Sequence, residues 1–140
     1  MTMTATARPI NGTLRHEIDV NRRHTTITDE PEQLGGNDTA PTPHELLPAI
    51  LASCVSTMIA LYARNHGWEL EQLRVDVAYD PDVTPRRIQT TVHLPDGLTA
   101  DQVRRLERVA HTCPVKRALE TGFTFDERTL LEQSTAQPSG

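Results

Sequence analysis

One long central segment of this chain has apolar side chains at the three- and four-residue spacing of a helix. Thr42 and Glu45 form a capping box around Pro43, and Gly67 follows the last helical turn. The segment carries almost no charge before its last turn, so we expect the helix to be buried nearly all round, partly by a second subunit. The apolar stripe consists of Leu47, Ile50, Leu51, Cys54, Met58, Leu61 and Tyr62.

Alternating apolar and polar residues predict strands on both sides of this helix. Before it, the β-like runs 14–20 and 24–28 flank Asn21-Arg22-Arg23, which is typical of a hairpin turn. After it, residues 75–79 and 88–94 alternate in the same way and are separated by a proline-containing turn. These patterns predict two antiparallel hairpins.

Two shorter helices and a last strand complete the predicted order. Thr99 is a helix cap, and Pro114 restarts a helix at Cys113 that Gly122 closes. Residues 123–131 are typical of a strand. The order is therefore ββ-α-ββ-α-α-β, an α+β fold in a single domain at 11–133, with a flexible N-terminus at 1–10 and a flexible C-terminus at 134–140.

The amino-acid composition of the chain limits the kinds of molecule that we expect it to bind. The chain has 14 Lys plus Arg and 19 Asp plus Glu, a net charge of −5, so we expect no binding to nucleic acid. We also expect no membrane association, since no stretch approaches the roughly 20 apolar residues of a membrane span. The first nine residues lack the apolar core of a secretion signal, which favours a cytoplasmic location. The six histidines show no metal-ligand spacing, so we expect no metal site.

The two cysteines, Cys54 and Cys113, are the main candidates for chemistry. Each lies on the apolar face of its own helix. Cys113 is in addition the residue before Pro114, where its sulfur would cap the helix near unpaired N–H groups. A cytoplasmic protein favours a transient or catalytic disulfide over a structural one. From these residues alone, two interpretations stay open: a redox pair, or two small buried hydrophobic side chains.

Two motifs together carry a family resemblance. The sequence GGNDTAPTPHELL at 35–47 leads into AILASC at 49–54, and HTCPV stands at 111–115. With these motifs, the chain resembles the OsmC/Ohr family of osmotically inducible and organic hydroperoxide resistance proteins over residues 11–132. The resemblance implies an OsmC-like fold, an intertwined homodimer with two long central helices between sheets, and active sites at the subunit interface.

The resemblance also implies a thiol peroxidase of the oxidative stress response. On that pattern Cys54 is the peroxidatic cysteine, which attacks an organic hydroperoxide and becomes a sulfenic acid. Cys113 is the resolving cysteine, which condenses with the sulfenic acid to a disulfide. A dithiol of the lipoamide type restores both thiols. No metal or organic cofactor is implied.

The helper residues depart from the pattern of the family's peroxidases. Those proteins have Glu directly after the proline that starts the helix, where this chain has His44, and Glu45 stands one residue later. Their activating Arg comes from the N-terminal hairpin or the loop after it, where Arg15, Arg22 and Arg23 are the candidates here. This pattern resembles the broader OsmC-like branch. Two alternatives therefore stand beside the peroxidase: a non-catalytic binder of apolar small molecules, and a redox sensor.

Overall fold

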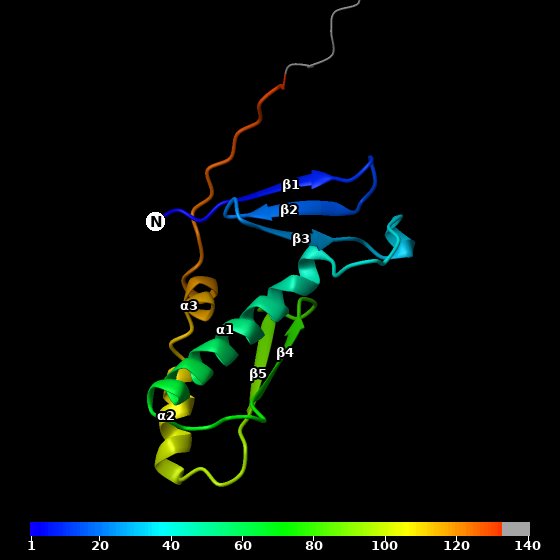
Figure 1. Cartoon of the computed structure of the whole chain (residues 1–140). Helices are drawn as coiled ribbons and strands as arrows, with labels where there is room; N and C mark the ends of the chain where they lie inside the picture. Colours follow the sequence, from blue (N-terminus) through cyan, green and yellow to red (C-terminus); the bar gives the residue numbers. More distant parts are fainter. Residues whose placement is uncertain (133–140) are drawn as a thin grey trace, which may run out of the picture.

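The computed structural model describes residues 1–132 and has the mixed α+β architecture that the sequence predicts. An N-terminal three-stranded antiparallel sheet precedes a long helix, and a two-stranded hairpin and two short helices follow (Figure 1). The elements are β1 (Ala5–Pro9), β2 (His16–Val20), β3 (His24–Thr28), a 3-10 turn η1 (Glu32–Leu34), α1 (Pro43–Asn65), β4 (Arg74–Asp80), β5 (Arg87–His93), α2 (Ala100–Ala110) and α3 (Pro114–Thr121).

The long helix α1 is the centre of the molecule. The predicted capping box is present, because the Thr42 hydroxyl accepts from the Glu45 N–H and the Glu45 carboxylate accepts from the Thr42 N–H. The helix continues through Pro48 to a cap at His66. Its buried residues are spaced by four, so they form one stripe along the helix. The stripe consists of Leu51, Val55, Ile59 and Ala63.

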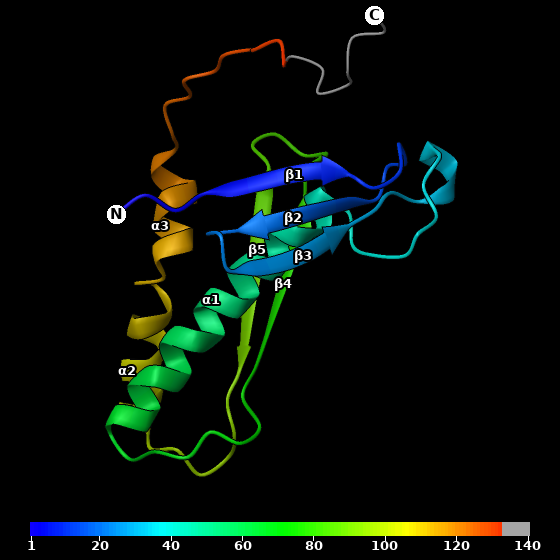
Figure 2. The ribbon, with the colours of Figure 1, turned by 45° about the horizontal axis from the view of Figure 1, so that its top comes forward.

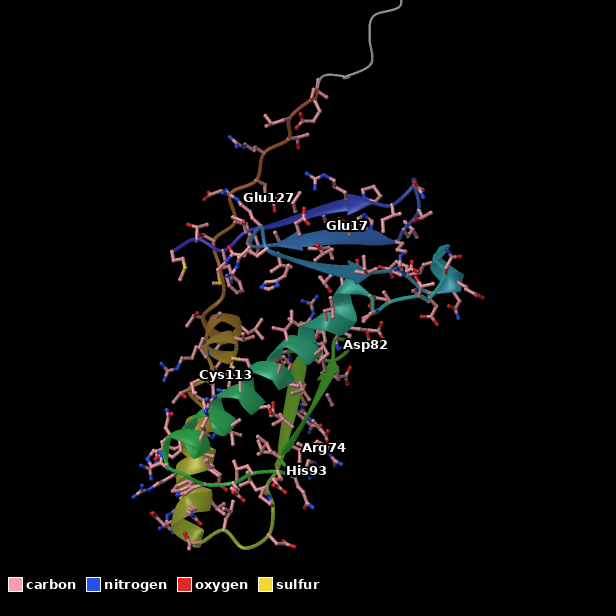
Figure 3. The ribbon with its side chains drawn as sticks, in the orientation of Figure 1. Glu17, Arg74, Asp82, His93, Cys113 and Glu127 are labelled. Carbon is pink, nitrogen blue, oxygen red and sulfur yellow. The ribbon has the colours of Figure 1, made fainter. Side chains whose placement is uncertain are left out.

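The core lies between α1, the β4–β5 hairpin and α2. Ile59 of α1 and Leu106 of α2 are completely buried, and Val75, Val77 and Val92 of the hairpin pack against them. The opposite face of the hairpin is polar: Arg74 and His93 lie side by side there (Figure 3), with Asp76 bonded to both. One face of this hairpin therefore closes the core, and the other is open to solvent.

The N-terminal sheet lies across the first turns of α1 and apart from the core, as Figures 1 and 2 show. The predicted hairpin is confirmed: β2 and β3 pair antiparallel from His16↔Thr28 to Val20↔His24. The loop that joins this sheet to α1 is held by Asp29, which is only 1% exposed. Its carboxylate accepts from the Glu30 N–H and from both the N–H and the hydroxyl of Thr39.

Of the two predictions for the chain ends, the one for the N-terminus was wrong, and the one for the C-terminus lies outside the described residues. Residues 1–10 were expected to be flexible, but Ala5–Pro9 form β1, which pairs with β2 from Ala5↔Val20 to Pro9↔His16. The run has no apolar alternation to reveal it, and its strand forms because β2 offers it a complete row of backbone hydrogen-bond partners. The predicted flexible C-terminus at 134–140 lies outside the described residues.

The predicted strand at 123–131 was wrong for this chain. The segment is extended and exposed, has no assigned secondary structure, and runs away from the body of the molecule (Figure 1). It has the composition of a strand, with Phe123 and Phe125 separated by one residue. A strand, however, is defined by the neighbour with which it pairs, and no strand within residues 1–132 pairs with this segment.

Within the single chain, Ile50 and Leu61 of α1 remain 52% and 48% exposed on one side. Burial nearly all round was expected with a second subunit and stays a prediction. The expectation that no stretch approaches the length of a membrane span was wrong, because the most apolar 18-residue window of α1 has a mean hydropathy of 1.9 and by length and composition alone would allow a crossing. Small Ala and Ser residues between the large apolar ones keep that window free of charge. In this fold the helix packs on β4, α2 and α3.

Candidate functional site

Two distant helices bring the cysteines together. Cys54 lies in the middle of α1, is half-buried, and packs against the core cluster that includes Cys113. Cys113 stands where α2 ends and α3 begins, beside α1 (Figure 3), and is completely buried. Both thiols are free. The chain thus places one accessible and one inaccessible sulfur next to each other.

The predicted cap at Cys113 is confirmed. Pro114 occupies the first turn of α3, and the Cys113 sulfur accepts from the backbone N–H of Lys116 at 3.5 Å. This position gives the sulfur one of the orphan N–H groups at a helix start, where negative charge is favoured. The charged group of Lys116 is turned to another partner, because its Nζ lies 2.9 Å from the Glu120 carboxylate.

The environment of Cys54 favours the neutral thiol. Burial is the largest cause that raises the pKa of the Cys54 thiol, and hydrogen bonding with the Cys113 thiol raises it further. The backbone N–H of Val115 acts in the opposite direction and lowers this pKa. The start of α3 therefore influences both sulfurs: the Val115 N–H acts on Cys54, and the Lys116 N–H donates to Cys113.

Arg15, a candidate activator, is engaged elsewhere. Its guanidinium donates to the Thr39 hydroxyl, which itself donates to the buried Asp29 carboxylate. Hydrogen bonds from Thr39 to Asp29 lower the pKa of Asp29 to about 2, with the Thr39 hydroxyl as the largest cause. Arg15 is in this way tied to the loop between β3 and α1 and not to Cys54.

Arg22 and Arg23, the other candidate activators, lie in the exposed turn between β2 and β3. They line an open hollow on the N-terminal sheet together with His24 and Asp19. In the single chain this turn is part of the sheet and not of the thiol site. The structure therefore brings Cys54 and Cys113 together and leaves all three arginines elsewhere.

The two candidates at the start of α1 have contacts of their own. The His44 ring packs edge-on against Tyr79 of β4, with 5.3 Å between the ring centroids. Glu45 belongs to the capping box, and its bonds to the Thr42 backbone and hydroxyl lower the pKa of its carboxyl group. Ten residues of straight helix span about 15 Å, so neither side chain touches Cys54 along its own helix.

A cavity lies on the other side of the core, between β5 and α2. It encloses about 500 Å³, a volume typical of small-molecule sites. Val55, the neighbour of Cys54, and Lys116, whose amide caps Cys113, both contribute to its wall. Its remaining lining is mostly apolar: Thr90, Val92, Leu94, Pro95, Val103, Leu106, Glu107, Ala110 and His111.

The sequence did not reveal the influence of the Val115 N–H on the pKa of Cys54. The available signal was the proline-started helix after Cys113, which leaves several N–H groups unpaired near its first residue. That signal predicts donors for Cys113 and contains nothing about a second sulfur.

No group of three or more His, Cys, Asp or Glu side chains within residues 1–132 is arranged to hold a metal ion.

Comparison with known proteins identifies a matching family model and several solved structures with the same fold. Residues 35–128 match the family model described as OsmC-like protein. A solved protein from Psychrobacter arcticus 273-4, assigned to osmotic stress induction and detoxification response, is 27% identical. The match covers 84% of this chain and 88% of that protein, with a TM-score of 0.65. A comparison with curated protein sequences finds no match.

Two further structures share the fold at lower identity. The organic hydroperoxide resistance protein OsmC of Legionella pneumophila is 22% identical over 85% of this chain and 89% of its own, with a TM-score of 0.57. The organic hydroperoxide resistance protein of Elizabethkingia anophelis is also 22% identical, over 84% and 87%, with a TM-score of 0.58. The α+β arrangement described above is thus the fold of these proteins.

Proposed function

Because this chain belongs to the OsmC-like protein family, we propose that it is a homodimeric thiol protein that reduces organic hydroperoxides through Cys54 and Cys113. The observation that carries the proposal is the packing of Cys54, from α1, against the buried cluster that contains Cys113 at the start of α3. The fold alone does not establish an activity. The placement of a half-buried sulfur against a buried one is what the proposed chemistry needs.

The first step uses the more accessible sulfur. The Cys54 thiolate attacks one oxygen of the hydroperoxide, and the O–O bond breaks. A sulfur–oxygen bond forms, and the leaving alkoxide takes a proton and departs as an alcohol. Cys54 is oxidised to a sulfenic acid by two electrons, and the peroxide is reduced by the same two.

The second step uses the buried sulfur. Cys113 attacks the sulfur of the sulfenic acid, a disulfide forms, and the hydroxyl group leaves as water after taking the Cys113 proton. The amide of Lys116, which already donates to Cys113, stabilises the attacking thiolate. An external dithiol of the lipoamide type then exchanges with the disulfide, returns both thiols and becomes a disulfide itself. The proposal includes no metal and no bound organic cofactor.

The proposal requires a cation beside Cys54, and no cationic group within residues 1–132 lowers the pKa of its thiol. Burial raises the pKa of the Cys54 thiol, so the attacking thiolate needs a positive neighbour. Arg15, Arg22 and Arg23 lie on the N-terminal sheet, away from their own Cys54. We assign the activating role to one of these arginines from the second copy, and a supporting role to His44 or Glu45.

Exposed apolar residues support the proposal that two copies of the chain form a homodimer. Ile50 and Leu61 project from the open side of α1, and Phe123 and Phe125 are 61% and 77% exposed on the C-terminal segment. The N-terminal sheet has no extensive packing against a helix of its own chain. A homodimer would cover these surfaces. A reducing, cytoplasmic location is part of the same proposal, because it keeps the resting thiols free.

The test is a stoichiometric oxidation of the reduced protein. Cumene hydroperoxide is added, free thiols are blocked with an alkylating reagent, and intact mass and non-reducing peptide maps are recorded. We expect a disulfide between Cys54 and Cys113, and faster oxidation by cumene hydroperoxide than by hydrogen peroxide. Two thiols that both remain alkylatable would sink the proposal.

Matched variants assign the two roles. Cys54→Ser should abolish peroxide consumption. Cys113→Ser should allow a single turnover and leave Cys54 trapped as sulfenic acid or over-oxidised. Serine also caps helices well, so α3 should remain intact in Cys113→Ser. Steady-state turnover that is unchanged in Cys54→Ser would remove Cys54 from the mechanism.

The apolar cavity supports a second candidate function. Its volume of about 500 Å³ and its mostly apolar wall suit a protein that binds small molecules, in which the cysteines only pack or sense oxidation. The raised pKa of Cys54 points the same way. A Cys54→Ser, Cys113→Ser protein that binds an apolar fluorescent probe as well as the native chain would favour this function over the peroxidase.

A further inference from the structure

A smaller hollow lies between α1 and α2, outside the thiol pair and the apolar cavity. It has a volume of about 240 Å³, below the usual range for drug-sized ligands. Tyr62 of α1 forms one wall, Arg105, Arg108 and Val109 of α2 form the other, and Thr112 closes the end. Two cationic side chains therefore meet one aromatic ring across a helix–helix groove.

The charge of this hollow is only partly compensated. Asp101 pairs with the Arg105 Nε at 3.1 Å and with Arg104 at 3.4 Å. Within residues 1–132, Arg105 makes no ion pair besides the one with Asp101, and Arg108 makes none. No acidic residue lines the hollow. Guanidinium groups in this arrangement suit an oxyanion, which they bind through paired N–H donors.

The aromatic wall is held in place by its neighbours. Tyr62 stacks on His66, with centroids 4.1 Å apart, and meets Trp68 edge-on at 5.7 Å. A ring fixed in this way loses little conformational freedom when a ligand binds. Val109 adds an apolar surface beside it. The hollow thus combines an anion-binding side with an apolar side.

We propose that this hollow binds a small organic acid, in which Arg105 and Arg108 hold a carboxylate or phosphate group and Tyr62 and Val109 contact its ring or apolar body. The site is separate from the peroxide chemistry, since it contains neither sulfur. Thr112 is nonetheless the residue directly before Cys113. An acid bound in this hollow therefore contacts the residue that directly precedes the buried Cys113, just after the end of α2.

Calorimetric titration of the full chain tests the proposal. The probes are phenyl phosphate, benzoate and inorganic phosphate, with phenol as the uncharged control. Trp68 is the only tryptophan and lies against Tyr62, so its fluorescence gives a second readout. We expect phenyl phosphate or benzoate to bind saturably and more tightly than phenol or inorganic phosphate, with an affinity that falls as salt is added. Whichever of the two binds better identifies the acid group.

Variants locate the binding site. Arg108→Gln should weaken the binding of the better probe roughly tenfold or more, since it removes a charge-assisted contact. Arg104→Gln is the matched control, because Arg104 stands on the same helix but does not line the hollow, and it should leave the affinity within about twofold. Tyr62→Phe keeps the ring and should weaken binding less than Arg108→Gln. Circular dichroism and thermal unfolding confirm that each variant is folded.

The Cys54→Ser protein separates this proposal from the peroxidase. We expect it to bind the better probe as the native chain does, whether or not Cys54 reduces peroxides. Equal responses to phenol and to both acids, or an Arg108→Gln protein that binds like Arg104→Gln, would overturn the proposal. So would the absence of any saturable heat change at millimolar probe.

Discussion

A buried carboxylate controls the loop that leads into the central helix. Asp29 accepts two bonds from Thr39 and one from the Glu30 N–H. Thr39 in turn accepts from Arg15, so a single aspartate joins the N-terminal sheet to the loop that leads into α1. The same loop needs Gly36, because a Cβ atom there would lie 2.0 Å from the Glu30 carbonyl oxygen.

We expect Asp29 to make stability depend on pH. Its pKa is lowered to about 2 in the folded chain, whereas an unfolded aspartate titrates near pH ~3.9. The folded state therefore binds fewer protons, and the stability that the carboxylate supplies is present above pH ~4 and is lost as the pH falls from about 4 to about 2. Asp29→Asn should lower the melting temperature at neutral pH, and its difference from the native chain should shrink across that window.

Thermal unfolding at several pH values measures this effect. Asp96→Asn is the control, since Asp96 is exposed and makes no side-chain hydrogen bond within the described residues. It should melt like the native chain at every pH. An Asp29→Asn protein with the same acid sensitivity as the native chain would show that other groups cause the acid dependence.

At the scale of elements, the helices are defined by their ends and by one apolar side. α1 and α2 each begin with a capping box, made by Thr42 and Glu45 in the first and by Thr99 and Gln102 in the second. α3 begins with Cys113 and Pro114. These caps satisfy backbone N–H groups that a helix cannot satisfy by itself. The position of each element along the chain therefore follows from a few local residues.

Loss of the first cap should be measurable. Thr42→Ala should reduce the free energy of unfolding by about 1 kcal/mol, the usual cost of losing an N-cap side chain. The pKa of Glu45 should rise only in part, because the Thr42 backbone N–H, the largest cause that lowers it, remains in the variant and only the contribution of the hydroxyl is lost. Denaturant unfolding and an NMR titration of the Glu45 carboxyl group test the two parts. Thr91→Ala, on the exposed side of β5, is the control and should change neither quantity.

At the scale of the whole molecule, the single chain exposes surfaces that a folded domain usually covers. The open side of α1, the free face of the N-terminal sheet and the extended segment after α3 are all on the outside (Figure 2). Their apolar residues include Ile50, Leu61, Phe123 and Phe125. These surfaces support the proposed homodimer, in which we propose that the activating cation comes from the second copy.

The oligomeric state gives the corresponding prediction. Ile50→Glu combined with Leu61→Glu should shift the native dimer to monomer in analytical ultracentrifugation, because burying two carboxylates at an interface is costly. Neither side chain belongs to the buried stripe, so the fold itself should remain. Ala78→Glu, on the polar outer face of β4, is the matched control and should leave the sedimentation unchanged. A native chain that sediments as a monomer would contradict the proposal directly.

Local interactions determined most of what the sequence could predict. The capping box at Thr42, the cap at Thr99, the turn at 21–23 and the proline-started helix at Cys113 involve residues at most four positions apart, so they act without any tertiary contact. The same is true of the choice between helix and strand in the strongly periodic segments, and of the apolar positions of both cysteines. These features were predicted from the sequence and confirmed by the structure.

The tertiary structure decided which distant groups meet. Strand β1 exists because β2 offers it an edge, and residues 123–131 have no strand because no edge within the described chain pairs with them. The packing of Cys54 against the cluster that contains Cys113 depends on how α1, α2 and α3 pack, and so does the arrangement of two arginines and Tyr62 around one hollow. Backbone pairing and side-chain contact between remote segments are properties of docking, and no local pattern encodes them.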